Sequence, residues 1–158
     1  MTPARRTELS RMVVDGELEQ VPVDPTVCRT MVEQARRHAR TAAAGRDMDD
    51  LEGAFQLAYD GCRKVALALV LSFGVRPSGE RGHHADTFAA AAAIVRNHAG
   101  QGTLGQAVDD ASDLRFARSG AEYRAEVVDE SAVDDALTIL DELLVGLVPV
   151  MEGRLATG

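Results

Sequence analysis

Apolar residues recur at every third or fourth position through most of the chain, and short runs of glycine, proline and polar residues interrupt this pattern. Such spacing is typical of amphipathic helices. It predicts helices within the first fifteen residues, from Pro25 to Gly45, from Leu51 to Gly74, from His84 to about Ala99, from Leu104 to about Tyr123, and from Ser131 onward. We therefore expect an all-α fold, an antiparallel bundle of about five helices with a short N-terminal helix before it.

Two of these segments have unusually broad apolar faces. Beyond Ala66 the segment that ends at Gly74 is apolar nearly all round, which predicts a helix at the centre of the fold. The last segment carries the apolar positions Val133, Ala136, Leu137, Leu140, Leu143, Leu144, Leu147 and Val150. A face of this width suggests a homodimer, because one small bundle has limited area to cover it.

The breaks between segments carry recognisable signals. Asp24-Pro25 combines an N-cap with a proline at the first helical position, and Ser131 or Asp129 is placed to cap the last helix. Val21-Pro-Val23 predicts a linker, and Arg76–Gly82, with its proline and glycines, predicts a loop.

Length and composition agree with one helical domain. The chain has 158 residues, of which only 4% are aromatic, and alanine is abundant, which favours close-packed helices over sheet. We expect residues 1–23 to form the N-terminal helix and linker, 24–153 the bundle, and 154–158 a tail.

The formal net charge is -8, so the surface should repel a phosphate backbone and non-specific DNA binding is not expected. Cys28 and Cys62 have no motif spacing and are expected to be reduced core residues. No apolar run is long enough for a membrane span, and no apolar core follows Arg5-Arg6. These features predict a cytoplasmic location without membrane association.

Candidate chemistry is sparse. His83, His84 and Asp86 are close in sequence, but adjacent residues point in different directions and no HExxH motif is present. Gly100–Gly105 matches GxGxxG, yet it follows a helix and not a strand. The spacing of Asp109 and Asp113 puts them on one helix face, which fits either a metal site or solvated surface. We expect no metal and no cofactor.

The most informative patch is the segment from Arg115 to Arg124, which also contains Arg118, Glu122 and Tyr123. One interpretation is an exposed ion pair between Arg118 and Glu122, with Tyr123 as an anchoring ring. The other is a nucleotide- or RNA-binding site in which Arg115, Arg118, Tyr123 and Arg124 bind phosphate, because guanidinium groups form bidentate hydrogen bonds with phosphate oxygens.

Several segments, taken in order, resemble the HEPN superfamily, and more narrowly its actinobacterial members. They are Ala54-Phe-Gln-Leu-Ala-Tyr-Asp-Gly-Cys-Arg-Lys-Val-Ala-Leu-Ala-Leu-Val, Gly74-Val-Arg, Gly82-His-His84 and Arg118-Ser-Gly-Ala-Glu-Tyr123, spread over roughly residues 25 to 152. The resemblance implies a bundle of four or five helices that forms a homodimer. It also implies a link to toxin–antitoxin or defence systems, often with a nucleotidyltransferase-like antitoxin as partner.

Many HEPN proteins are metal-independent ribonucleases with the motif R-x(4–6)-H. Under the resemblance Arg118 stands at the arginine position, and Tyr123 stands where the family has histidine. These two are the candidate catalytic residues, but a tyrosine with a pKa near 10 is a poor general base at neutral pH. Arg76 and His83 also match the motif, outside the family's position for it.

The resulting hypothesis is a non-catalytic HEPN-like dimer that serves as a nucleotide- or RNA-binding or interaction module. One alternative is an active metal-independent ribonuclease toxin, in which Tyr123 or a displaced histidine transfers the proton. Another alternative is a purely structural, oligomerising helical protein.

Overall fold

A computed structural model describes the backbone of residues 7–79, 83–97, 102–123 and 127–157, and the side chains of these ranges except 118–123. The elements are α1 (Glu8–Val14), β1 (Leu18–Gln20), α2 (Pro25–Asp47), α3 (Leu51–Ser72), β2 (Val75–Pro77), α4 (His83–Arg96), α5 (Gly102–Tyr123) and α6 (Glu130–Thr157). The all-α class and the helical bundle predicted from the sequence are confirmed.

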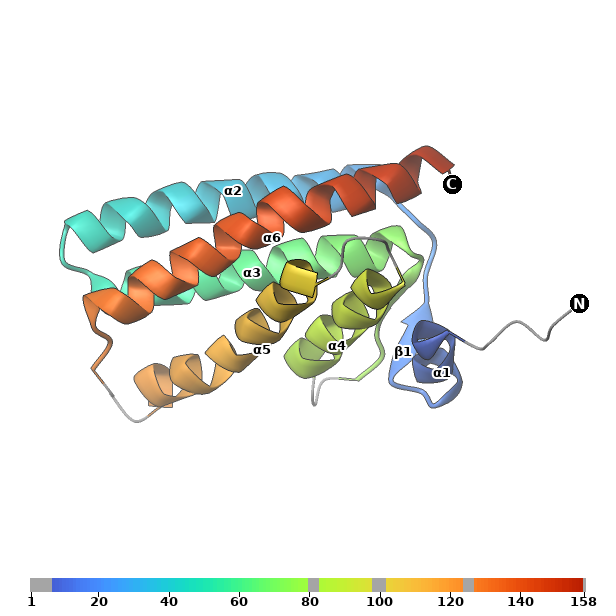
Figure 1. Ribbon diagram of the computed structural model, residues 1–158, viewed down its shortest axis with the longest axis horizontal. Helices are drawn as coiled ribbons and strands as arrows, with labels where there is room; N and C mark the ends of the chain where they lie inside the picture. The colour runs from blue at the N-terminus through green and yellow to red at the C-terminus, as the bar shows by residue number, and fades with distance from the viewer. Residues whose placement is uncertain (1–6, 80–82, 98–101, 124–126, 158) are drawn as a thin grey trace, which may run out of the picture.

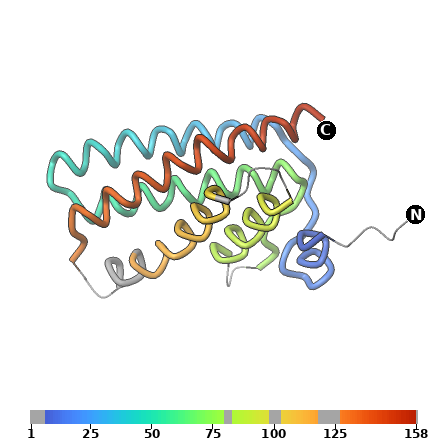
Figure 2. The backbone as a smooth tube through the Cα atoms, in the orientation of Figure 1, coloured from blue at the N-terminus to red at the C-terminus, as the bar shows by residue number. Residues whose placement is uncertain are grey.

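Helices α2 and α3 form a long antiparallel pair, and α6 packs along both of them (Figure 1). Helix α5 runs antiparallel to α6, and α4 packs against both α3 and α5 (Figure 2). The small unit of α1 and β1 lies beside the end of the molecule where α6 finishes. Helix α3 therefore has neighbours on several sides, as the broad apolar pattern beyond Ala66 predicts.

Aspartates begin three of the helices. Asp24 Oδ1 accepts from the backbone N–H of Thr26 at 2.9 Å, and Asp50 Oδ1 accepts from that of Gly53 at 3.1 Å. Asp129 Oδ1 accepts from the backbone N–H of Ala132 at 2.8 Å, so of the two caps predicted for the last helix Asp129 is the one used. Each bond satisfies a donor that the first helical turn would otherwise leave unpaired.

The predicted helix ends are close to the observed ones. Helix α2 continues two residues past the predicted end at Gly45, to Asp47. Helix α5 begins at Gly102, two residues before the predicted Leu104, and runs through Ser119-Gly120 to Tyr123, as predicted. Packing accounts for the continuation of α2, because a Cβ at Gly45 would lie in ordinary van der Waals contact with Ala54 Cβ, at 3.6 Å. Close tertiary contact outweighs the modest helix propensity of glycine.

A two-stranded sheet was not predicted. β1 and β2 pair antiparallel, with Glu19 opposite Arg76 and Leu18 opposite Pro77, so part of the predicted Arg76–Gly82 loop is a strand. The Arg76 guanidinium contacts the Glu19 carboxylate at 2.5 Å across the two strands. Strands of three residues leave too little alternation in the sequence to be recognised.

The core runs along α3, where Ala58, Cys62, Val65 and Leu69 are at most 1% exposed. Both cysteines are buried free thiols, as predicted. Burial raises the pKa of the Cys62 thiol to about 12, which keeps it protonated and unreactive. Among the residues that the structure describes, no helix is both long and apolar enough to cross a membrane.

The broad apolar face of α6 is covered within the single chain. Of the eight positions that suggest a dimer, six are buried and the other two, Leu137 and Val150, are half-buried. The width of this face is therefore no longer an argument for dimerisation, and the homodimer stays a prediction.

Candidate functional site

The structure describes one of the four predicted nucleotide-binding residues in full. Arg115 is half-buried on α5, and its guanidinium lies 4.8 Å from the centre of the Phe116 ring. Positions 118 and 123 belong to the same helix, but the Arg118 and Tyr123 side chains, and with them the proposed Arg118–Glu122 pair, lie outside the described residues, as does Arg124. On a continuous helix, positions five residues apart differ by about 140° around the axis. The backbone of one chain thus does not bring positions 118 and 123 to one face.

Arg115 lines a cleft of about 360 Å³ between α4 and α5. The cleft is lined by Ala85, Asp86, Phe88, Ala89, Ala92, Arg96, Asp109, Ser112 and Arg115. Its two arginines are balanced by two aspartates, so the cleft has no excess positive charge. Burial, followed by the charge of Glu17, raises the pKa of the Asp86 carboxyl, while His83 opposes the shift. The cleft alone gives little preference for an anion.

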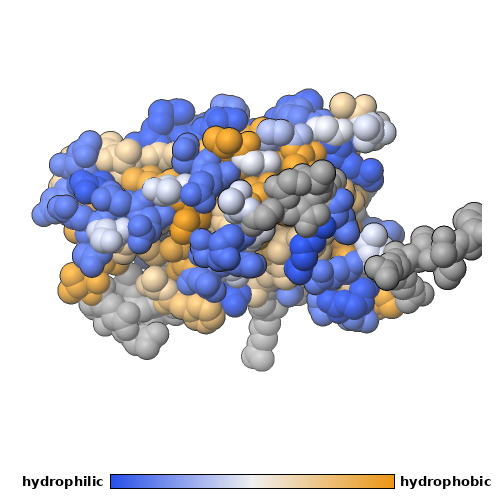
Figure 3. Space-filling view, viewed as in Figure 1, coloured by the Kyte–Doolittle hydropathy of each residue, from blue (hydrophilic) through white to orange (hydrophobic). Residues whose placement is uncertain are grey.

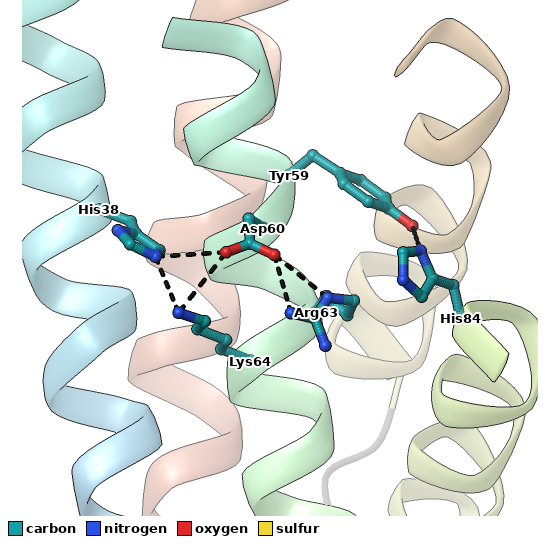
Figure 4. A network of polar contacts seen from close by, with 6 residues as sticks. All are labelled: His38, Tyr59, Asp60, Arg63, Lys64 and His84. Carbon is teal, nitrogen blue, oxygen red and sulfur yellow. Dashed lines mark hydrogen bonds and ion pairs between the residues drawn. The ribbon is translucent and has the colours of Figure 1, made fainter. Parts of the chain in front are cut away.

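A second group of polar residues lies between α2 and α3 and was not predicted as a site. It consists of His38 on α2 and Asp60, Arg63 and Lys64 on α3, and we call it the α2–α3 polar cluster (Figure 4). The side chains are 23%, 37%, 22% and 19% exposed, respectively. Charged groups this far removed from water need partners, and in this cluster each group supplies partners for the others.

Asp60 is at the centre of the cluster. Its Oδ1 accepts from Arg63 Nη2 at 2.9 Å and from Arg63 Nε at 3.1 Å. Its Oδ2 lies 3.6 Å from Lys64 Nζ and 3.2 Å from His38 Nε2. Burial alone would raise the pKa of the Asp60 carboxyl, but the Arg63 hydrogen bonds and the positive charges of Arg63 and Lys64 together outweigh it, so the pKa lies below its usual value.

His38 is held in its neutral form. Burial and then the charge of Lys64 lower the pKa of the imidazole, with a smaller contribution from Arg37, against the opposing effect of Asp60. Lys64 Nζ lies 3.0 Å from His38 Nε2, so the ammonium donates to this nitrogen when the ring proton is on Nδ1. The cluster therefore contains two cations, one carboxylate and one neutral imidazole at neutral pH.

The local sequence explains how α3 presents these groups. Positions 60, 63 and 64 have i, i+3, i+4 spacing and lie on one helix face, whereas Ala58, Cys62 and Val65 face the core. His38 reaches this face only because α2 folds back antiparallel to α3 (Figure 4). The spacing on α3 could have identified half of the cluster, but its partner on α2 depends on the tertiary fold.

A neighbouring contact joins α3 to α4. The Tyr59 hydroxyl and His84 Nδ1 are 2.9 Å apart, and the Tyr59 ring is 1% exposed. Of the predicted histidine group, His84 therefore has a structural partner on α3, and Tyr59 also packs at 6.3 Å from the Phe88 ring. This contact holds α4 against α3.

The chemistry available to the cluster is the binding of an anion. Arg63 uses Nε and Nη2 on Asp60, and Lys64 has three donors, so each retains protons for a further acceptor. A single carboxylate with two cations beside it is a poor set of ligands for a divalent cation, which prefers several oxygen donors. Comparison of the chain with family models, with curated proteins and with solved structures finds no match.

Proposed function

We propose that the chain is a non-catalytic helical module that binds the phosphates of a nucleotide or of single-stranded RNA at the α2–α3 polar cluster. The observation that carries this proposal is the excess of positive charge in a half-buried place: Arg63 and Lys64 share one carboxylate, Asp60. Arg37, exposed on α2 and close enough to influence the titration of His38, adds a third cation.

Partial burial strengthens the attraction of Arg63 and Lys64 for a phosphate. A charge that is shielded from water interacts more strongly with a nearby anion, because the local dielectric constant is lower. The arginine fork and the lysine ammonium are also the side chains that most often bind phosphate in proteins. A phosphate oxygen at this surface would therefore gain two charge-assisted hydrogen bonds.

The resemblance to HEPN proteins supports an RNA or nucleotide ligand, and two further observations support a module without catalysis. Tyr123 stands where the resemblance expects the catalytic histidine. In addition, the unbroken helix through positions 118 and 123 separates them by about 140°. Neither observation favours the ribonuclease alternative.

The first test measures binding of a short fluorescein-labelled single-stranded RNA by anisotropy over a range of salt concentrations. Arg63→Ala should weaken binding about tenfold and reduce the dependence of log K on log[salt] by about one unit, as expected for the loss of one phosphate contact. Arg40→Ala is the matched control, because Arg40 is exposed on the same helix as His38 and about 160° from it around the axis.

A second variant separates phosphate binding from a purely structural role of the cluster. Asp60→Asn removes the carboxylate that competes with phosphate for Arg63 and Lys64, so RNA affinity should rise by a few fold even though the protein loses stability. Unchanged RNA affinity in both Arg63→Ala and Asp60→Asn would refute the proposal. Cleavage of the RNA that depends on His38 would show instead that the protein is a ribonuclease.

The homodimer and the nucleotidyltransferase-like partner implied by the resemblance stay predictions. Light scattering at micromolar concentration tests the first, and co-purification with the product of a neighbouring nucleotidyltransferase gene tests the second.

A further inference from the structure

The surface between α5 and α6 contains a continuous groove, which we call the α5–α6 groove. One part, of about 550 Å³, is lined by Thr103, Leu104, Ala107, Asp141, Glu142, Val145 and Gly146. The next part, of about 410 Å³, is lined by Asp110, Asp113, Leu114, Asp135, Thr138, Ile139 and Glu142. Glu142 belongs to both parts, so together they follow about three helical turns, or about 17 Å.

Both helices present a regular stripe to this groove. Six of the seven lining positions on α6 have the spacing i, i+3, i+4, i+7, i+10 and i+11 from Asp135 to Gly146, and the seventh is Asp141, next to Glu142. The lining positions on α5 follow a similar stripe from Thr103 to Leu114. The fully buried residues Leu140, Leu143 and Leu147 of α6 do not line the groove. The groove lies over the core, since its Ala107 is 2% exposed and Leu104 and Ile139 pack against core residues.

The floor of the groove is apolar. Leu104, Leu114 and Ile139 are half-buried along it, and Val145 is 72% exposed. Figure 3, which views this face, shows apolar surface interrupted by hydrophilic side chains over α5 and α6. A half-covered row of large apolar groups at helical spacing is the surface that an amphipathic helix buries when it docks.

The rim of the groove is acidic. Asp110, Asp113, Asp135, Asp141 and Glu142 line it, and no cation within the described part of the chain lies at ion-pair distance from any of them. The other faces of α6 differ, because Asp134 and Glu130 pair with Arg46, and Glu152 pairs with Arg29. Carboxylates gathered beside an apolar floor select a partner of opposite charge.

We infer that the α5–α6 groove binds an amphipathic, cationic helix of another protein. The helix would be about three turns long, with apolar residues at i, i+3 or i+4, and i+7 against Leu104, Ile139 and Val145. Lysine or arginine residues on both sides of its apolar stripe would pair with the rim carboxylates. This inference is independent of phosphate binding, because the α2–α3 polar cluster and the groove share no residue.

The test uses a labelled synthetic helix of leucine and lysine with this spacing, together with two control peptides. One control replaces every lysine by glutamate, and the other has the same composition in scrambled order. Anisotropy at about 0.1 M salt should show binding of the first peptide only, since screening at this ionic strength still leaves contacts at close range effective. Equal binding of the scrambled peptide would refute a helix-docking groove.

Variants of the protein locate the binding site. Asp141→Asn combined with Glu142→Gln should weaken binding at least tenfold, and so should Val145→Arg. The matched controls are Asp47→Asn combined with Asp49→Asn, which changes the net charge equally on exposed residues elsewhere, and Val127→Arg, at a valine that is 90% exposed. The controls should stay within about twofold of the wild type, since they lie outside the groove.

Further readouts keep the result interpretable. Circular dichroism should show the same helix content in every variant, and Thr138→Arg, also at an exposed groove position, replaces Val145→Arg if that variant fails to fold. RNA affinity should not change with Val145→Arg. If the groove variants change the mass of the protein in light scattering and not its affinity for the peptide, a second copy occupies the groove and the inference is wrong.

Discussion

Helix α6 makes two contacts that differ in almost every physical respect. Toward α3 it buries Leu140 completely against Gly61, where an added Cβ would lie 2.8 Å from Leu140 Cδ2. Toward α5 it meets Leu104 at Gly146, where an added Cβ would overlap Leu104 Cδ1, but this leucine is half-exposed. Both contacts use a glycine for close approach, yet only the first is closed.

The charged groups near the two contacts also differ, because among the described residues they are paired near one and unpaired near the other. Where α6 faces α2, Arg46 pairs with Asp134 at 2.5 Å and Arg29 pairs with Glu152 at 2.9 Å. The rim of the α5–α6 groove has carboxylates without a described cation. The difference suggests that the α3 side of α6 serves stability and that the α5 side has a surface for binding.

The largest expected difference in stability is between two variants that each truncate one apolar side chain, one on either side of α6. Leu140→Ala should lower the free energy of unfolding by about 3 kcal/mol, because it leaves a cavity in the closed core. For a domain of this size that is a fall of about 6–12 °C in melting temperature. Val145→Ala should change it by less than about 0.5 kcal/mol, since the side chain is mostly in water. Thermal melts check both; a large loss from Val145→Ala would mean that the groove is a packed contact.

Alanine substitutions of Gly61 and Gly146 should differ less in their effect on stability. Gly61→Ala gains up to about 1 kcal/mol of helix propensity but forces Leu140 to move within a filled core, so a net loss of about 1 kcal/mol is expected. Gly146→Ala gains the same propensity, and Leu104 is able to turn toward the open groove, so stability should stay within about 0.5 kcal/mol of the wild type. Denaturant unfolding measures both. An equal loss from the two variants would show that Leu104 is held as firmly as Leu140.

The smallest expected effect concerns pH. Because the folded state lowers the pKa of His38 below the ordinary 6.5, the unfolded state binds the proton more tightly. Stability should therefore be at its full value above pH 6.5 and fall as the pH drops from there toward the folded pKa. We expect a small fall in melting temperature over this window.

His38→Gln should remove this pH dependence, whereas Asp141→Asn, in the groove, should leave it unchanged. Asp60 acts in the same direction but at lower pH: its lowered pKa contributes stability above about pH 4 that disappears as the pH falls through the folded value. Melting temperatures between pH 4.5 and 7.5 thus isolate the histidine. An identical slope in wild type and His38→Gln would contradict the lowered pKa.

Much of the fold could be predicted from the pattern of residues. The caps at Asp24 and Asp129 and the period of the apolar positions indicate where helices begin and which faces they bury. The predicted end at Gly45 was two residues early, since α2 continues to Asp47, and the predicted end near Tyr123 is confirmed. The strands β1 and β2 pair residues almost sixty positions apart, which no local pattern reports.

The candidate site, too, could be predicted only in part from the sequence. Asp60, Arg63 and Lys64 stand on one helix face by spacing alone, but the sequence gives no indication that His38 reaches them. Asp109 and Asp113 were predicted to share one helix face, but Asp109 lines the cleft between α4 and α5, whereas Asp113 lines the α5–α6 groove. The packing of α6 against α5 brings Asp135, Asp141 and Glu142 to the same groove as Asp113. Sequence reasoning found these groups singly because each helix carries only part of them.

The sequence by itself determined the all-α class, the central place of α3 and the helix-starting caps, because these follow from local periodicity and from hydrogen bonds between near neighbours. Tertiary structure alone decided which charges are paired and which face of α6 stays open. The reason is that pairing and exposure depend on the approach of helices distant in sequence, as with Lys64 and His38 at 3.0 Å or Gly146 beside Leu104.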